Sequence, residues 1–198
     1  VGVRNLGNIS GGTGGIQIDT KGQLINSNAR IASSGAVSVK TNGALQNVTG
    51  KILSNKTISI DTNKGAITNT RAGNIMSDAD VYVSSGAINN TNGKVAATGT
   101  LALNTNNATL TNSGKGNTVG IEAGIVALQT GTLDNRNGQI KGYYVGTSST
   151  SVNNSNKGLI DSWGDVDVVS TGTVNNTGGL IRAATGHVMI DAKNATIN

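Results

Sequence analysis

The side chains of this sequence that could carry acid–base chemistry are ten acidic residues and one histidine. The closest acidic pairs are Asp78 with Asp80 and Asp165 with Asp167. Paired carboxylates serve as acid and base in glycoside hydrolysis, and carboxylates also bind Ca²⁺. Here each pair flanks one apolar residue, so that in a strand both members face solvent. The pairs also lie far apart in the sequence, and we therefore predict no catalytic residues and no enzymatic activity.

The sole histidine, His187, precedes Val188 at an outward strand position and has no serine, cysteine or carboxylate partner within its own repeat. A solvated imidazole explains it better than a general base does. Cysteine is absent, and neither a GGxGxD repeat nor EF-hand spacing occurs. The glycine-rich segment 11–15 has no strand-then-helix context for phosphate binding. The sequence thus predicts no metal and no cofactor.

Aromatic side chains offer one candidate for ligand contact. Three consecutive repeats each carry aromatic or imidazole groups shortly before the third strand, at Tyr143, Tyr144, Trp163 and His187. Aligned in a stack, they would form a small exposed patch able to stack on a sugar or contact a partner protein. Isolated surface aromatics remain the alternative.

Composition predicts a narrow, regular core. Phenylalanine and proline are absent, tryptophan occurs once, and 29 glycines accompany many asparagine, threonine and serine residues. Valine, isoleucine and leucine strands joined by glycine and asparagine turns fit this composition. The absence of cysteine is compatible with secretion. The net charge of +5 is spread over single lysines and arginines, and this distribution predicts no nucleic-acid binding. The sequence contains no apolar stretch of 18 residues, so membrane insertion of this segment is not expected.

Organisation comes from a repeat of about 21 to 22 residues, best seen in residues 86–107. An apolar residue opens each repeat, at Val3, Leu24, Leu45, Ile67, Ile88, Leu110, Leu133, Val152, Val174 and Ile197. A second apolar position follows at Ile9, Ile31, Ile52, Ile75, Val95, Ile121, Ile140, Ile160 and Ile181. An alternating pair such as Leu101 and Leu103 completes each repeat. The alternation indicates three short strands per repeat, and a fixed period of this size indicates a solenoid.

One repeat has too few apolar side chains to close a core, so the coils must stack and pair their strands with those above and below. We therefore predict an all-β, right-handed parallel β-helix of about nine coils. Residues 1–198 would form a single segment, an internal fragment of a longer array. At the spacing of parallel strands, nine coils span about 43 Å.

An asparagine stands two residues after each of the first nine opening positions, at Asn5, Asn26, Asn47, Asn69, Asn90, Asn112, Asn135, Asn154 and Asn176. Side chains two apart in a strand share a face, so these amides should point inward. A buried amide without a partner costs about 1–3 kcal/mol. Stacked copies avoid this cost by donating to the next coil and accepting from the previous one, which predicts an internal asparagine ladder.

Two segments break the period: an expanded turn at residues 111–120 and a shortened repeat at residues 146–151. Insertions in solenoids map to turns, where they either carry function or reflect neutral variation in turn length.

The recurring frame GxLxNxxGxIxS occurs as GALQNVTGKILS at 43–54, as GTLDNRNGQI at 131–140 and as GTVNNTGGLIRA at 172–183. It resembles the filamentous haemagglutinin repeat of bacterial two-partner-secreted exoproteins, which include adhesins and contact-dependent growth inhibition exoproteins. The resemblance covers residues 3–197. It implies a long right-handed β-helix exported through an outer-membrane barrel partner. It transfers no binding or catalytic residue.

From these observations we expect a shaft segment of a secreted or cell-surface exoprotein, with receptor contact made by other regions. One alternative is an adhesive module that binds glycans or receptors through its outer faces. Another is a β-helical polysaccharide lyase or hydrolase. Because terminal coils expose strand edges, end-to-end association of the fragment is also expected.

Overall fold

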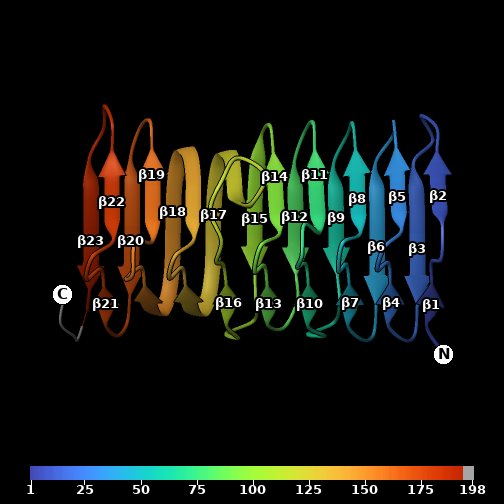
Figure 1. The fold of residues 1–198 in the computed structure, drawn as a ribbon, viewed down its shortest axis with the longest axis horizontal. Coiled ribbons are helices and arrows are strands. Elements are labelled where there is room, and N and C mark those ends of the chain that lie inside the picture. The colour runs from blue at the N-terminus through green and yellow to red at the C-terminus, as the bar shows by residue number, and fades with distance from the viewer. Residues whose placement is uncertain (194–198) are drawn as a thin grey trace.

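The computed structural model describes residues 1–193 and is all-β, without a helix. Its parallel strands stack as a β-solenoid of about nine turns with about 21 residues per turn. Figure 1 shows the coils following one another along the long axis from the N-terminus to the C-terminus. This confirms the predicted fold class. Ile197, expected to open a tenth coil, lies outside the described residues.

Each coil contributes one strand to each of three sheets, here called the first, second and third faces. The first face holds β1 (Val3–Arg4), β4 (Leu24–Ile25), β7 (Leu45–Gln46), β10 (Ile67–Thr68), β13 (Ile88–Asn89), β16 (Leu110–Thr111) and β21 (Val174–Asn175). The second face holds β2 (Asn8–Gly11), β5 (Arg30–Ser33), β8 (Lys51–Ser54), β11 (Asn74–Ser77), β14 (Lys94–Ala97), β19 (Leu159–Ser162) and β22 (Leu180–Ala183). The third face holds β3 (Ile16–Thr20), β6 (Val37–Thr41), β9 (Ile58–Asp61), β12 (Val81–Ser84), β15 (Thr100–Asn104), β20 (Val166–Ser170) and β23 (Val188–Ala192).

Two long strands, β17 (Gly120–Asp134) and β18 (Gln139–Asn153), run through all three faces without interruption. They pair in parallel with one constant register, in which Ile121 faces Ile140 and Leu133 faces Val152. Residues 146–151 are therefore part of β18 and not an irregular turn, and the shortened repeat expected there is confirmed, because Leu133 and its partner Val152 are 19 positions apart. No residue from 121 to 136 or from 138 to 155 has a positive φ; glycine and threonine in β17, and glycine, serine and threonine in β18, occupy these corners in extended backbone.

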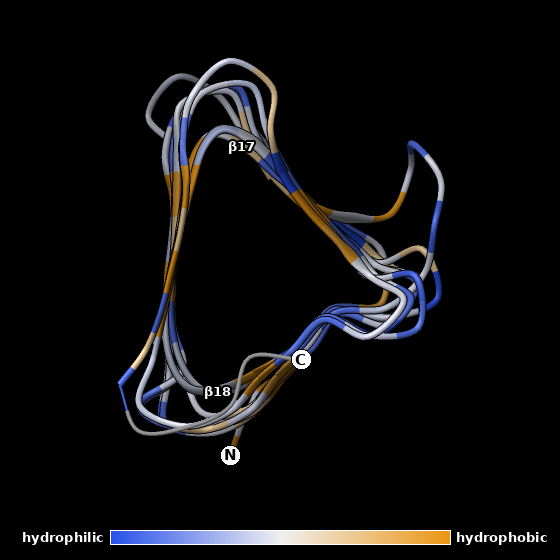
Figure 2. Cartoon of the chain, turned by 90° about the vertical axis from the view of Figure 1, so that its left-hand side faces the viewer, coloured by the Kyte–Doolittle hydropathy of each residue, from blue (hydrophilic) through white to orange (hydrophobic). Residues whose placement is uncertain are grey.

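The strand register matches the apolar columns of the sequence. Val3 pairs with Leu24, Leu24 with Leu45, and Leu45 with Ile67. The same column continues through Ile88, Leu110, Leu133 and Val152 to Val174. Parallel in-register pairing brings like side chains together, and these columns form the buried core. Figure 2 shows the stack end-on as a triangular outline with three sides.

One glycine in most coils is required by close contact with the coil beside it. At Gly93 an added Cβ would collide with the carbonyl oxygen of Asn69 and would lie 2.6 Å from the Asn90 amide oxygen. The same two kinds of neighbour surround Gly50, Gly73, Gly138 and Gly179. The glycine that precedes the second apolar position therefore lets the chain turn directly over the asparagine column.

The expanded turn predicted at residues 111–120 lies between β16 and β17 and packs against the second face. Gln139 donates its side-chain amide to the carbonyl oxygens of Gly116 and Val119, the latter at 2.8 Å. Lys94 Nζ lies 3.5 Å from the Asn117 carbonyl oxygen and forms an ion pair with Glu122. Two side chains from neighbouring coils thus hold the turn in place.

Residues 1–193 contain no helix that is long and apolar enough to cross a membrane.

Candidate functional site

The nine asparagines form one continuous column on the inside of the stack. Each of the first eight donates its Nδ2–H to the Oδ1 of the asparagine in the next coil, over 2.6 to 2.9 Å. The seven members from Asn26 to Asn154 are fully buried, and Asn5 is 7% exposed. The column includes the half-buried Asn176 as its last acceptor. We call this column the asparagine ladder.

The second amide hydrogen of each of the first eight ladder residues also has a partner, a backbone carbonyl oxygen. Asn69 Nδ2 donates to the Lys94 carbonyl oxygen at 3.0 Å, and Asn112 Nδ2 to the Gln139 carbonyl oxygen at 2.9 Å. Each Oδ1 from Asn26 onward accepts from the coil before it. Because both hydrogens and the oxygen have partners, burial of these amides carries no unpaired-group penalty.

Two further polar columns seal the other corners, and the sequence analysis did not predict them. Where the second face ends, buried serine hydroxyls donate to a backbone carbonyl of the coil before, as from Ser33 to Gly12 at 2.9 Å and from Ser54 to Gly35 at 2.7 Å. Where the third face ends, buried threonines close their own turn, as Thr105 does by donating to Ala108 at 2.6 Å. The repeated Ser at the end of the second strand and Thr at the end of the third were the available signals.

Members of the two candidate carboxylate pairs accept hydrogen bonds from backbone N–H groups of the next coil. Asp78 and Asp80 lie in the turn between β11 and β12, so they flank the turn residue Ala79 and not a strand residue. Asp80 Oδ1 accepts the backbone N–H of Thr100 at 2.7 Å. Asp165 Oδ1 accepts the backbone N–H of His187, also at 2.7 Å. These hydrogen bonds hold turns of adjacent coils together.

Two other carboxylates form surface ion pairs with arginines. Arg136 donates to both carboxylate oxygens of Asp134, and this hydrogen bonding holds the pKa of Asp134 below its usual value. Arg182 contacts Asp161 of the coil before it in the same two-pronged way, at 2.8 Å for each bond. Exposed pairs of this kind add little stability.

The four residues of the expected aromatic patch lie at different places. Tyr143 and Trp163 are 65% and 60% exposed and occupy adjacent coils at the corner between the second and third faces. His187 is exposed just before β23, with Nδ1 3.6 Å from Asp165 Oδ1 of the preceding coil. Tyr144 turns over the third face instead and donates its hydroxyl to Asp167 Oδ2 at 2.7 Å. Tyr143 and Tyr144 line separate grooves.

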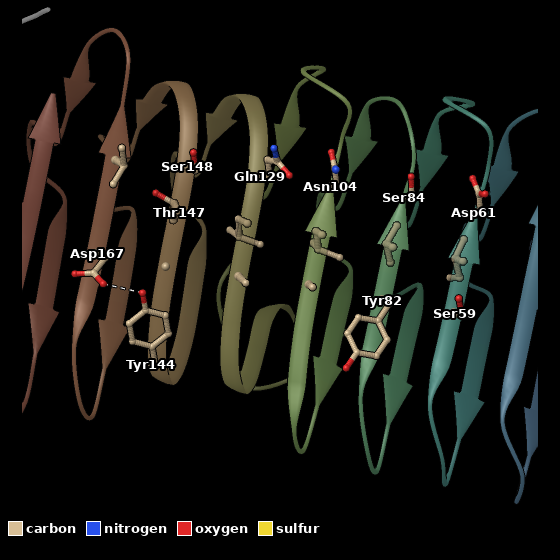
Figure 3. A pocket seen from close by; sticks show the side chains of 18 of the residues that line it. Ser59, Asp61, Tyr82, Ser84, Asn104, Gln129, Tyr144, Thr147, Ser148 and Asp167 are labelled. Atoms are coloured by element: carbon tan, nitrogen blue, oxygen red, sulfur yellow. Dashed lines mark hydrogen bonds between the residues drawn. The ribbon is translucent and has the colours of Figure 1, made fainter. Parts of the chain in front are cut away.

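Tyr144 belongs to an open groove of about 680 Å³ on the outside of the third face, which we call the third-face groove. Its floor is a row of small residues in register, Ala102, Ala127 and Gly146. Tyr82 stands beside Ala102 in the preceding coil and borders this floor, and the lining continues past it to Ser59. Tyr144 leans over Gly146 at the other end, as a Cβ built on Gly146 would lie 3.0 Å from its ring. Figure 3 shows both tyrosine rings face-on over this sheet.

Polar side chains form a second row beside the floor. Ser84, Asn104, Gln129 and Ser148 pair in sequence across four coils. Asn104 Oδ1 accepts the backbone N–H of Asn106 at 2.8 Å, which leaves its NH₂ group as the free donor. Asp61 and Asp167 are the ionisable carboxylates of the lining, and neither lysine nor arginine lines the groove.

The hydrogen bond to Asp167 dominates the electrostatics at the Tyr144 end. It favours the protonated phenol, and with partial desolvation it raises the pKa of Tyr144 to about 12. Tyr144 is thus a neutral, oriented ring across the physiological pH range.

A second groove of about 650 Å³ lies on the second face beside the expanded turn and includes Asp78, Glu122, Lys141 and Tyr143. Met76, which precedes Asp78 by two residues, pairs with Ala96, and Ala96 pairs with Glu122. The two carboxylates therefore lie two coils, or about 10 Å, apart along the axis. Glu122 is in addition paired with Lys94. This separation does not bring two carboxylates to one reacting atom.

Within residues 1–193 no group of three or more histidine, cysteine, aspartate or glutamate side chains could hold a metal ion. One buried side-chain atom of this part of the chain has no hydrogen-bond partner, the hydroxyl oxygen of Thr147. Thr147 lies in the inner column between Leu128 and Val168, where an apolar residue would fit.

Comparisons with protein-family models, with curated proteins and with solved structures found no match to this chain.

Proposed function

We propose that this chain is a segment of the β-helical shaft of a secreted or cell-surface bacterial exoprotein of the filamentous haemagglutinin type. In this proposal the chain has a mechanical role and performs no catalysis. It holds a receptor-binding or toxin region, located elsewhere in the protein, away from the cell that exports it. Export would use an outer-membrane barrel partner.

The observation that supports this proposal is the uninterrupted asparagine ladder. Its eight bonds have nearly one length and link every coil from Asn5 to Asn176. Each coil therefore rests on the same internal contacts whatever its outer faces carry. A stack of this kind gains length by adding coils, because stability in a solenoid is a sum of coil and neighbour terms. Length without dependence on particular surface residues is what a shaft requires.

The experiment is to remove one coil from the full-length exoprotein. Deletion of residues 24–44 joins Gln23 to Leu45, which occupies the register position of Leu24. The ladder then closes from Asn5 to Asn47. We expect the shortened protein to be exported and to retain adhesion or growth inhibition, with a reach shorter by about 4.8 Å.

The matched control deletes residues 24–34, which removes β4 and β5 and joins the two third-face strands β3 and β6 by residues 21–23 and 35–36 alone. This link is too short to go once around the stack, so the deletion should disrupt folding of the coils beside it. A one-coil deletion that is exported and folded but inactive would contradict the shaft proposal. It would show that this segment carries a specific site in the deleted coil.

A further inference from the structure

The third-face groove, lined by Tyr82, Ala102, Ala127, Gly146, Tyr144 and the polar row beside them, has no role in the shaft. Shaft stability comes from the interior, whereas these side chains face solvent. Tyr82 is 44% exposed, and Ala127 and Gln129 are exposed. Large exposed apolar side chains arranged around a hollow mark a binding surface more often than isolated ones do.

We propose that the third-face groove binds a neutral, polyhydroxylated oligosaccharide lying along the axis of the stack. This inference goes beyond the shaft and does not depend on it.

The shape of the third-face groove suits such a ligand. Tyr82 and Tyr144 lie three coils apart, about 14 Å at the spacing of parallel strands, which matches a short oligosaccharide. Between them the floor carries only methyl groups and one hydrogen, at Ala102, Ala127 and Gly146. A flat ligand can lie on such a floor, with its apolar faces against the two tyrosine rings. Figure 3 shows the rings and the polar row on the same side of the sheet.

The polar row beside the floor suits a ligand with many hydroxyl groups. Asn104, Gln129 and Ser148 follow the floor at one residue per coil and combine donors with acceptors. A regular row of amides and hydroxyls suits a ligand that presents hydroxyl groups at regular intervals. Binding sites of mostly apolar surface with a few placed polar groups are the usual form of small-ligand sites.

The charge of the groove favours a neutral ligand. The chain carries +5, yet the groove is lined by Asp61 and Asp167 without a lysine or arginine. Sulfated or carboxylated glycans and nucleic acid would meet repulsion here. A peptide is also a poor fit, because the groove lies on a sheet face and offers neither a free strand edge nor pockets for alternate side chains. A neutral glycan meets neither obstacle.

Tyr144 is set in place before any ligand arrives. Its hydroxyl is bonded to Asp167, and its ring packs over Gly146, where a side chain would collide with it. A ring that is already immobilised loses little entropy when a ligand stacks on it.

The test measures binding of neutral cello- and chito-tetrasaccharides to the purified chain by isothermal titration calorimetry. We expect Tyr82→Ala and Tyr144→Ala each to weaken binding by about tenfold or more. Ala127→Phe should abolish it, because the new ring fills the exposed floor without entering the core. Circular dichroism melting of each variant checks that the fold is retained.

Tyr143→Ala is the matched control, because it removes an exposed tyrosine next in sequence to Tyr144 but in the other groove. Binding that survives Ala127→Phe, or that falls equally in Tyr143→Ala, would overturn the proposal. Absence of binding to any neutral tetrasaccharide would overturn it, as would a preference for a heparin-derived tetrasaccharide. A dimer of the chain that dissociates in Ala127→Phe would instead assign the face to a second copy.

Discussion

Replacing ladder residues by leucine tests whether the asparagines act as one unit. Asn90→Leu leaves two buried groups without partners: the Asn69 Nδ2–H, which donates to Asn90 over 2.7 Å, and the Asn112 Oδ1, which accepts from Asn90 over 2.9 Å. At about 1–3 kcal/mol for each group, the loss is about 4 kcal/mol, and the transfer of leucine to the interior offsets about 2 kcal/mol. A net destabilisation of about 2 kcal/mol is expected.

The decisive variant is Asn69→Leu combined with Asn90→Leu. The double substitution still orphans only two groups, the Asn47 Nδ2–H and the Asn112 Oδ1. By the same figures, its loss of about 4 kcal/mol is offset by about 4 kcal/mol from the two leucines, so the double variant should be about as stable as the wild type, with a coupling energy of about 4 kcal/mol. The matched control is Asn26→Leu with Asn112→Leu, which orphans four groups and should be additive.

Urea unfolding followed by far-ultraviolet circular dichroism gives these free energies, provided that the denaturant slope is unchanged between variants. A terminal substitution, Asn176→Leu, should cost less than Asn90→Leu, because Asn176 is the last acceptor of the ladder and half-buried, so that its loss leaves only the Asn154 Nδ2–H without its ladder partner. Additive costs for Asn69 and Asn90, or a leucine variant at Asn90 as stable as the wild type, would refute the ladder as the source of stability.

Three further predictions concern single sites. Thr147→Val should stabilise the chain by about 1 kcal/mol in urea unfolding, because it replaces a buried hydroxyl that lacks a partner; destabilisation would mean that the hydroxyl is satisfied. Thr49→Asn should raise the melting temperature and stabilise the chain by about 1 kcal/mol, because the β-branched Thr49 has a φ of 57° at a position where other coils have Asn28 and Asn92. An unchanged melting temperature would contradict this. Asp167→Asn should lower the pKa of Tyr144 from about 12 towards 10 in an ultraviolet titration of the phenol, and no change would exclude the hydrogen bond as its cause. In the wild type, the stability from this bond is complete below about pH 10, where the phenol is protonated in both states, and is lost as the pH rises through about 12.

The interior could be derived from the sequence because a one-dimensional period maps directly onto stacked columns. Leu24, Leu45 and Ile67 recur at the coil spacing, and in-register pairing places them together. The asparagine column follows from the same argument, since a residue two positions along a strand shares its face. The corner hydroxyls of Ser54 and Thr105 follow the same period but offered no apolar signal.

The outer surface could not be derived in the same way. The third-face groove depends on the residue between the two apolar positions of each third strand, which reads Tyr82, Ala102, Ala127 and Gly146 in successive coils. Along the chain these residues are about 20 positions apart and have no common chemistry. The partner of His187 likewise comes from the coil before, at Asp165, and not from its own repeat.

The central claim, a linear stack with one coil per repeat, is tested most directly by distances between spin labels, because the chain has no cysteine of its own. Gln17→Cys is combined in turn with Ala102→Cys, Ala127→Cys and Met189→Cys, which lie four, five and eight coils away in one outward column. The Cα separations of these three pairs should be about 19, 24 and 38 Å, one strand spacing for each coil. Label-to-label distances from double electron–electron resonance should increase in the same steps. Separations that do not grow with the number of coils would contradict the stack, and with it the shaft and the groove.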